Sequence, residues 1–146
     1  MANGKDLPFG ELAPGKDAAE QVNQNRRSDQ RRCILSRMAI RHASPGEAID
    51  VRPLGTRLAG AQSVALFKSE HLELMRLVLP VGKSMSPHKV VGEITLQCIE
   101  GRIDVTADGR SHVLLAGQLL YLSGNEEHGV TALEDASALL TIVLRK

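Results

Sequence analysis

Short apolar segments separated by turn residues run from residue 48 to the C-terminus, and they constrain the fold more than any other feature of the chain. The segments rich in Val, Ile and Leu are residues 48–52, 63–68, 72–79, 94–99, 102–107, 111–115, 118–122 and 136–144. Between two of them, Asp108-Gly109 suits a two-residue hairpin, in which both central positions take positive φ. No helical periodicity intervenes, so the pattern predicts an all-β sandwich or barrel.

Composition limits the classes of function that this fold can serve. The chain has 146 residues, with 18 Lys and Arg against 17 Asp and Glu, and 2% of its residues are aromatic. This length fits one domain with its own core, and the near-neutral charge excludes a strongly basic nucleic-acid binder. Scarce aromatic residues exclude stacking platforms for single strands and aromatic cages for cations.

Localisation is predicted from what the sequence omits. It has no apolar stretch long enough to span a membrane and no visible secretory signal, so we expect no membrane partner. Cys33 and Cys98 lack metal-binding spacing, and lone cysteines in such a chain are more often reduced thiols than a disulfide. The sequence therefore predicts a cytoplasmic protein.

The N-terminal region differs in composition from the rest of the chain. Residues 1–37 hold an Arg-rich run and few apolar residues to offset the entropy of ordering. We therefore predict an extension over residues 1–41 that is poorly ordered or partly helical, followed by the barrel domain over residues 42–146. A solvated tail is favoured over a basic arm that contacts a partner. Because Met38 opens a segment typical of a domain start, residues 1–37 are alternatively an expendable extension.

Of the five histidines, His88 and His128 stand in the most informative contexts. Gly82 is followed after five residues by His88, and Gly101 closes the segment in register. This spacing resembles the first motif of the cupin superfamily. In that motif a second histidine and a glutamate follow the first histidine, and here Val90 and Ile94 occupy those positions.

The segment around His128 resembles the second cupin motif. Gly117 and His128 fit its spacing, whereas Ser123, Asn125 and Ala132 replace the motif's proline, glycine and asparagine. The short gap between the two motifs is typical of small bacterial cupins.

This resemblance implies a small single-domain barrel of the jelly-roll type, also called a double-stranded β-helix, over residues 48–144. Intact cupins hold a divalent metal, commonly iron, manganese, nickel or zinc, with three histidines and one glutamate. The resemblance therefore implies His88 and His128 as metal ligands, with Glu93, one residue before the motif's glutamate position, as a third.

The alternation of side chains along a strand bears on which way Glu93 faces. If His88 points into the barrel, the even-numbered residues that follow also point inward and Glu93 points outward. The residues then expected to line an aliphatic pocket are Val90, Ile94, Leu96 and Cys98. A bulge at Gly92 would instead turn Glu93 inward, and both arrangements stay open.

The favoured function is a barrel that binds a metal ion or small ligand through His88 and His128, with no assigned reaction or catalytic residue. A metal-dependent dioxygenase or isomerase acting on a small polar substrate is the alternative, with Glu93 as third ligand. A non-catalytic module that only dimerises is a further alternative. Residues 138–144 are apolar on both faces, which predicts that a second subunit covers the strand in a homodimer.

Overall fold

The computed structural model describes residues 41–145, so residues 1–40 of the predicted extension lie outside the described residues. The described part contains one short 3-10 helix, η1 (Gly55–Gly60), and nine strands: β1 (Val64–Lys68), β2 (Leu72–Leu79), β3 (Ser84–His88), β4 (Ile94–Glu100), β5 (Arg102–Ala107), β6 (Arg110–Leu115), β7 (Leu119–Leu122), β8 (His128–Ala132) and β9 (Ala136–Val143). This composition confirms the predicted all-β fold.

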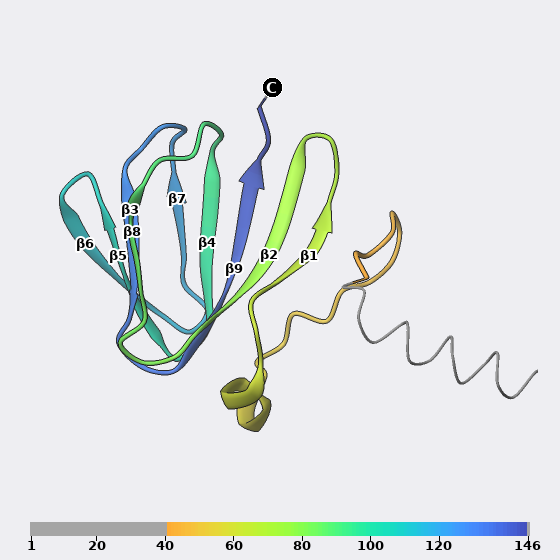
Figure 1. The fold of residues 1–146 in the computed structure, drawn as a ribbon, viewed down its shortest axis with the longest axis horizontal. Coiled ribbons are helices and arrows are strands. Elements are labelled where there is room, and N and C mark those ends of the chain that lie inside the picture. Colours follow the sequence, from red (N-terminus) through yellow and green to blue (C-terminus); the bar gives the residue numbers. More distant parts are fainter. Residues whose placement is uncertain (1–40, 146) are drawn as a thin grey trace, which may run out of the picture. The chain divides into compact units, whose positions relative to one another are not determined.

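The strands form two sheets, and every pairing within them is antiparallel. One sheet has the order β1-β2-β9-β4-β7 and the other the order β3-β8-β5-β6 (Figure 1). The β3–β4, β5–β6 and β7–β8 connections lie at the same end of the sheets in Figure 1. Residues far apart in the sequence therefore meet at this end of the barrel.

The core between the sheets is aliphatic, as the scarcity of aromatic residues requires. Its buried members include Leu79, Leu96, Ile103 and Val105, which come from both sheets. From Ile94 to Cys98 on β4 the even-numbered residues are buried and the odd-numbered ones only partly so, as the alternation predicts. Buried aliphatic area of this kind is the main source of stability for a small barrel.

Most predicted strands are present, with ends shifted by a residue or so. The Asp108-Gly109 hairpin is confirmed, because both residues have positive φ, +48° and +72°. The predictions missed β3 and β8, whose sequences contain Pro87 and Gly129.

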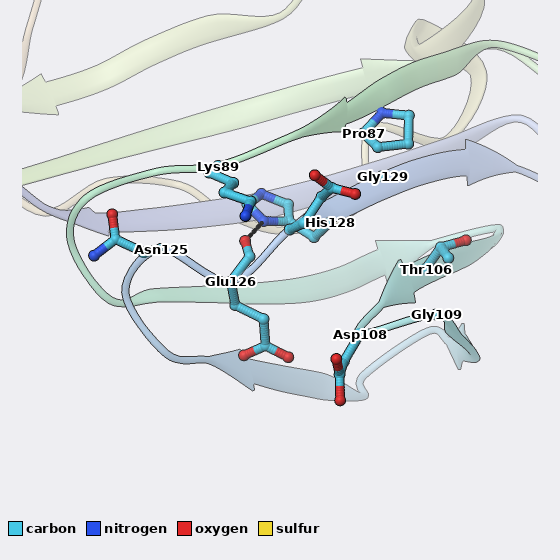
Figure 2. A pocket seen from close by; sticks show the side chains of 10 residues that line it. Pro87, Lys89, Thr106, Asp108, Gly109, Asn125, Glu126, His128 and Gly129 are labelled. Atoms are coloured by element: carbon cyan, nitrogen blue, oxygen red, sulfur yellow. Dashed lines mark hydrogen bonds between the residues drawn. The ribbon is translucent and has the colours of Figure 1, made fainter.

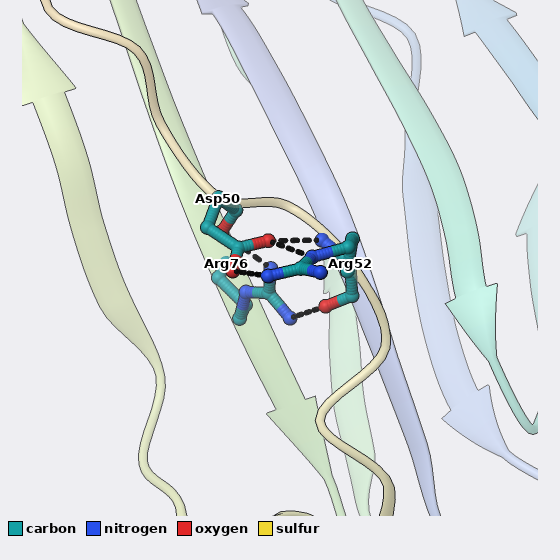
Figure 3. A network of polar contacts seen from close by, with 3 residues as sticks. All are labelled: Asp50, Arg52 and Arg76. Carbon is teal, nitrogen blue, oxygen red and sulfur yellow. Dashed lines mark hydrogen bonds and ion pairs between the residues drawn. The ribbon is translucent and has the colours of Figure 1, made fainter.

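The strand predicted over residues 48–52 is wrong, because this segment crosses the outer face of a sheet instead of joining it (Figure 3). Arg76 on β2 donates hydrogen bonds to the backbone carbonyls of Arg52 and Asp50, at 3.0 and 3.1 Å. The Arg52 guanidinium also pairs with the Asp50 carboxylate and holds the pKa of that carboxyl far below its usual range. Arg76 is only 5% exposed under this segment. Residues 50–52 of the same chain thus cover part of the outer face of the five-stranded sheet.

Candidate functional site

The structure brings His88 and His128 together at one end of the four-stranded sheet. His88 is the last residue of β3, His128 is the first residue of β8, and the two are direct partners in the antiparallel register. Their ring centroids lie 4.5 Å apart with the planes tilted by 55°. Histidines forty residues apart in sequence thus form one pair, as the motif spacing predicts.

The register places both imidazoles on the inner face of the sheet. Direct cross-strand partners share a face, and the partner of His128 on β5 is Ala107, which is 1% exposed. His128 itself is 5% exposed, whereas His88, at the end of its strand, is open to solvent. The His128 ring is therefore buried, and solvent reaches the pair from the side of the His88 ring.

Both histidines make the same hydrogen bond to the chain two residues before them. Nδ1 of His88 lies 2.9 Å from the carbonyl oxygen of Ser86, and Nδ1 of His128 lies 2.9 Å from that of Glu126. A carbonyl oxygen only accepts, so each Nδ1 carries the hydrogen and donates it. In the neutral ring, Nε2 then keeps its lone pair, which is the arrangement that orients a histidine for metal or ligand binding.

Glu93 lies away from the histidine pair, on the outer side of the other sheet. Its carboxylate accepts a 2.8 Å hydrogen bond from the Tyr121 hydroxyl and pairs with Arg145. The bond to Glu93 is also the main cause of the raised pKa of Tyr121. The register of β4 with β9 is regular from Ile94 to Cys98, and the Val143 amide donates a 2.9 Å hydrogen bond to the Glu93 carbonyl. Glu93 therefore continues the alternation of β4 and faces outward.

The four residues predicted to line an aliphatic pocket form packing instead. Ile94 and Leu96 are each 2% exposed and Cys98 is fully buried within the core, while the partly buried Val90 packs against it. Burial raises the pKa of the Cys98 thiol, which keeps it in the unreactive protonated form. Its sulfur approaches the carbonyl oxygens of Glu100 and Gly101.

A cavity of about 390 Å³ borders His128, and none of the four residues predicted to line a pocket belongs to it (Figure 2). It lies on the outer side of the sheet, where Thr106 and Gly129 are cross-strand partners. Its lining comes from the segments next to the two histidines and from the β5–β6 hairpin: Pro87, Lys89, Thr106, Asp108, Gly109, Asn125, Glu126, Glu127, His128 and Gly129. Figure 2 shows the Glu126 carbonyl turned toward His128 and its carboxylate turned away. Adjacency in sequence to the two motif histidines could have found most of these residues, whereas Thr106, Asp108 and Gly109 on the hairpin carry no such signal.

A conventional metal cluster is not found within residues 41–145. No group of three or more His, Cys, Asp and Glu side chains there could hold a metal ion. In the same part of the chain, no helix is long and apolar enough to cross a membrane.

The two antiparallel sheets, with a histidine pair at the mouth between them, define a small barrel of the jelly-roll class. Residues 75–144 match the family model described as cupin domain, and this part of the chain is a small cupin domain. The expectation from the two motifs is therefore confirmed. No curated protein matches the sequence.

Solved structures show the same fold. A conserved protein of unknown function from Streptococcus pyogenes is 18% identical, with a TM-score of 0.57 over 73% of this chain and 95% of that one. An RmlC-like cupin from Shewanella frigidimarina is 21% identical, with a TM-score of 0.57 over 73% and 93%. A mutant of salicylate 1,2-dioxygenase from Pseudoaminobacter salicylatoxidans is 15% identical, with a TM-score of 0.52 over 55% of this chain and 25% of that one.

Of the four metal ligands that an intact cupin supplies, this chain retains two, both histidines. His88 and His128 are in place with free Nε2 lone pairs, and they fit an ion that takes two protein nitrogens. Val90 and Ile94 put aliphatic groups where the other two ligands of an intact cupin would stand. The remaining ligands of a bound ion would therefore come from water or from a small molecule.

Proposed function

We propose that this cupin domain binds a metal ion, or a small ligand, through Nε2 of His88 and Nε2 of His128. The observation that carries the proposal is the matched pair of 2.9 Å Nδ1 contacts, to Ser86 and Glu126. An isolated inward histidine is often only satisfied packing, but two adjacent rings held in the same tautomer leave two lone pairs for one acceptor.

The surroundings of the pair support an exchangeable ligand. His88 is exposed to solvent, which gives a small ligand an entry path to the pair. A bound metal would supply Lewis acidity at this position. The chain's own residues orient the two imidazoles and leave the remaining coordination positions open.

Zinc titration with single histidine variants tests the proposal, since zinc is redox-silent and binds imidazole. The wild type is expected to bind one Zn²⁺ per chain, and His88→Ala or His128→Ala each to lower the affinity at least about tenfold by removing one of two ligands. His71→Ala is the matched control, because His71 is exposed and lies just before β2, outside the histidine pair. Unchanged affinity in both site variants would overturn the proposal.

The dioxygenase or isomerase alternative needs a third protein ligand beside the histidines. Glu93 is occupied with Tyr121 and Arg145 on the outer face, so its position does not favour this alternative. Glu93→Gln is accordingly expected to leave the zinc affinity unchanged. A loss of affinity in this variant would revive the alternative.

The homodimer and the dimerising-module alternative stay predictions. Within residues 41–145, exposed apolar side chains lie on β6, at Val113 and Leu115, and on β7, at Leu119 and Tyr121. Both strands are sheet edges, which are ready templates for pairing with another chain. A sedimentation measurement is expected to give twice the monomer mass, and a monomeric mass would remove this prediction.

A further inference from the structure

A third possible donor lies next to the histidine pair, and it is a thioether. Met85 on β3 is the direct partner of Val130 on β8, and Val130 is buried on the same face as His128. The partly buried Met85 packs against the core, so its side chain also points inward. It stands diagonally across the two strands from His128, a separation that a long side chain spans.

Within residues 41–145, the carboxylates that flank the pair are exposed or turned to other partners. Glu127 and Asp108, which border the cavity on the outer side of the sheet, are both exposed. Glu126 directs its carboxylate to the backbone amide of Ser123, 3.1 Å away, and Glu93 lies on the other sheet's outer side. No group of three or more His, Cys, Asp and Glu side chains converges anywhere in the described range. The inward donors are therefore two imidazoles and one thioether, none of which supplies a negative charge.

The charge and the preferred coordination number of an ion decide whether two imidazoles and a thioether bind it well. The cost of transferring an ion from water rises with the square of its charge, so a divalent ion without a carboxylate is penalised far more than a monovalent one. Iron and manganese favour several hard oxygen or nitrogen ligands, whereas thioether sulfur selects soft ions such as Cu(I). Two imidazoles and a thioether fill the low coordination number of Cu(I).

We infer that His88, His128 and Met85 form a site selective for a soft monovalent cation of the Cu(I) class over the divalent metals of intact cupins. This inference rests on the proposed function, because it uses the same two imidazoles, and it adds Met85 as the selectivity-determining ligand. The aliphatic replacements Val90 and Ile94 remove the donors that a divalent ion would need.

The test compares Cu(I) and Zn²⁺ affinities of the full chain, with Cu(I) measured anaerobically by competition with bicinchoninate. Wild type is expected to bind Cu(I) at least about a hundredfold more tightly than Zn²⁺. Met85→Leu, a swap that conserves volume, is expected to weaken Cu(I) binding about tenfold and to leave Zn²⁺ binding unchanged. Met75→Leu is the matched control, because Met75 faces the same core from β2 of the other sheet.

Each outcome separates this inference from the proposed function. X-ray absorption of the Cu(I) complex is expected to show a sulfur neighbour that disappears in Met85→Leu but not in Met75→Leu. Equal affinity for Zn²⁺ and Cu(I), or an unaltered copper environment in Met85→Leu, overturns the inference while the histidine site stands. Failure to bind either ion overturns both.

Discussion

Glu100 at the end of β4 joins three separate parts of the described chain. Its carboxylate accepts hydrogen bonds from the backbone amides of Leu54 and Gly55, both at 2.9 Å, and from the hydroxyl of Ser137 on β9. Desolvation pushes the pKa of this carboxyl upward, but these hydrogen bonds and the charge of Arg76 outweigh it and lower the pKa overall. The carboxylate form is thus the one that the fold stabilises.

This arrangement predicts a pH-dependent loss of stability. A pKa that is lower in the folded than in the unfolded chain stabilises the fold fully above the ordinary glutamate pKa of about 4.3, and the contribution is lost as pH falls through the folded value. Glu100→Gln should therefore lower the free energy of unfolding at pH 7 by about 1–2 kcal/mol, since hydrogen bonds to a charged group are weakened.

Urea unfolding at several pH values checks this prediction, and the difference between wild type and Glu100→Gln should shrink as the pH drops below about 4.3. Glu134→Gln is the control, because Glu134 is exposed and its ion pair with the exposed Arg102 is 3.4 Å long. A difference between wild type and Glu100→Gln that stays constant with pH would contradict the account.

At the scale of elements, the strands that carry the site were the hardest to predict. The sequences of β3 and β8 read Ser-Met-Ser-Pro-His and His-Gly-Val-Thr-Ala, which have few of the β-branched residues that mark a strand. Gly129 approaches the neighbouring strand closely, since a Cβ there would lie 3.2 Å from the Met85 carbonyl oxygen. Pairing with β5, which is rich in buried residues, holds β8 in place despite its weak local preference.

Gly92, just before β4, provides a test of how closely the elements pack. A Cβ on Gly92 would lie 1.6 Å from the backbone carbonyl oxygen of Val143, so one of the two chain segments has to move. Gly92→Ala should lower the free energy of unfolding by about 2–3 kcal/mol or more, as overpacking against backbone does. Thermal or urea unfolding measures the change.

Gly60→Ala is the matched control, because a Cβ at Gly60 meets nothing within 4 Å and its φ is not positive. The control is expected to change stability by less than about 0.5 kcal/mol. Similar stabilities for the two alanine variants would mean that the close approach of Gly92 to β9 is not present in solution.

At the scale of the whole molecule, the sequence was sufficient for the barrel and for the histidine pair. The Val, Ile and Leu segments predicted most strands, and the motif spacing paired His88 with His128. Strand alternation pointed Glu93 outward unless a bulge intervened, and the bond of its carboxylate to Tyr121 places it outward.

The position of the cavity and the path of residues 50–52 depend on tertiary packing, which the sequence pattern does not show. The inward positions Ile94, Leu96 and Cys98 are packed in the core, whereas the cavity beside His128 lies on the outer side of its sheet and at the adjoining loops. The sequence also could not predict that residues 50–52 cover the sheet, because this position depends on hydrogen bonds from Arg76, which is distant in sequence.

The protonation and metal response of the imidazole nitrogens test the central claim most directly. Long-range proton–nitrogen NMR spectra of the metal-free protein should place the hydrogen on Nδ1 in both His88 and His128, because both nitrogens donate to carbonyl oxygens. One equivalent of Zn²⁺ should then shift the Nε2 signals of these two rings and leave those of His42 and His71 in place. A hydrogen on Nε2 of either ring, or unshifted Nε2 signals at both, would contradict the account.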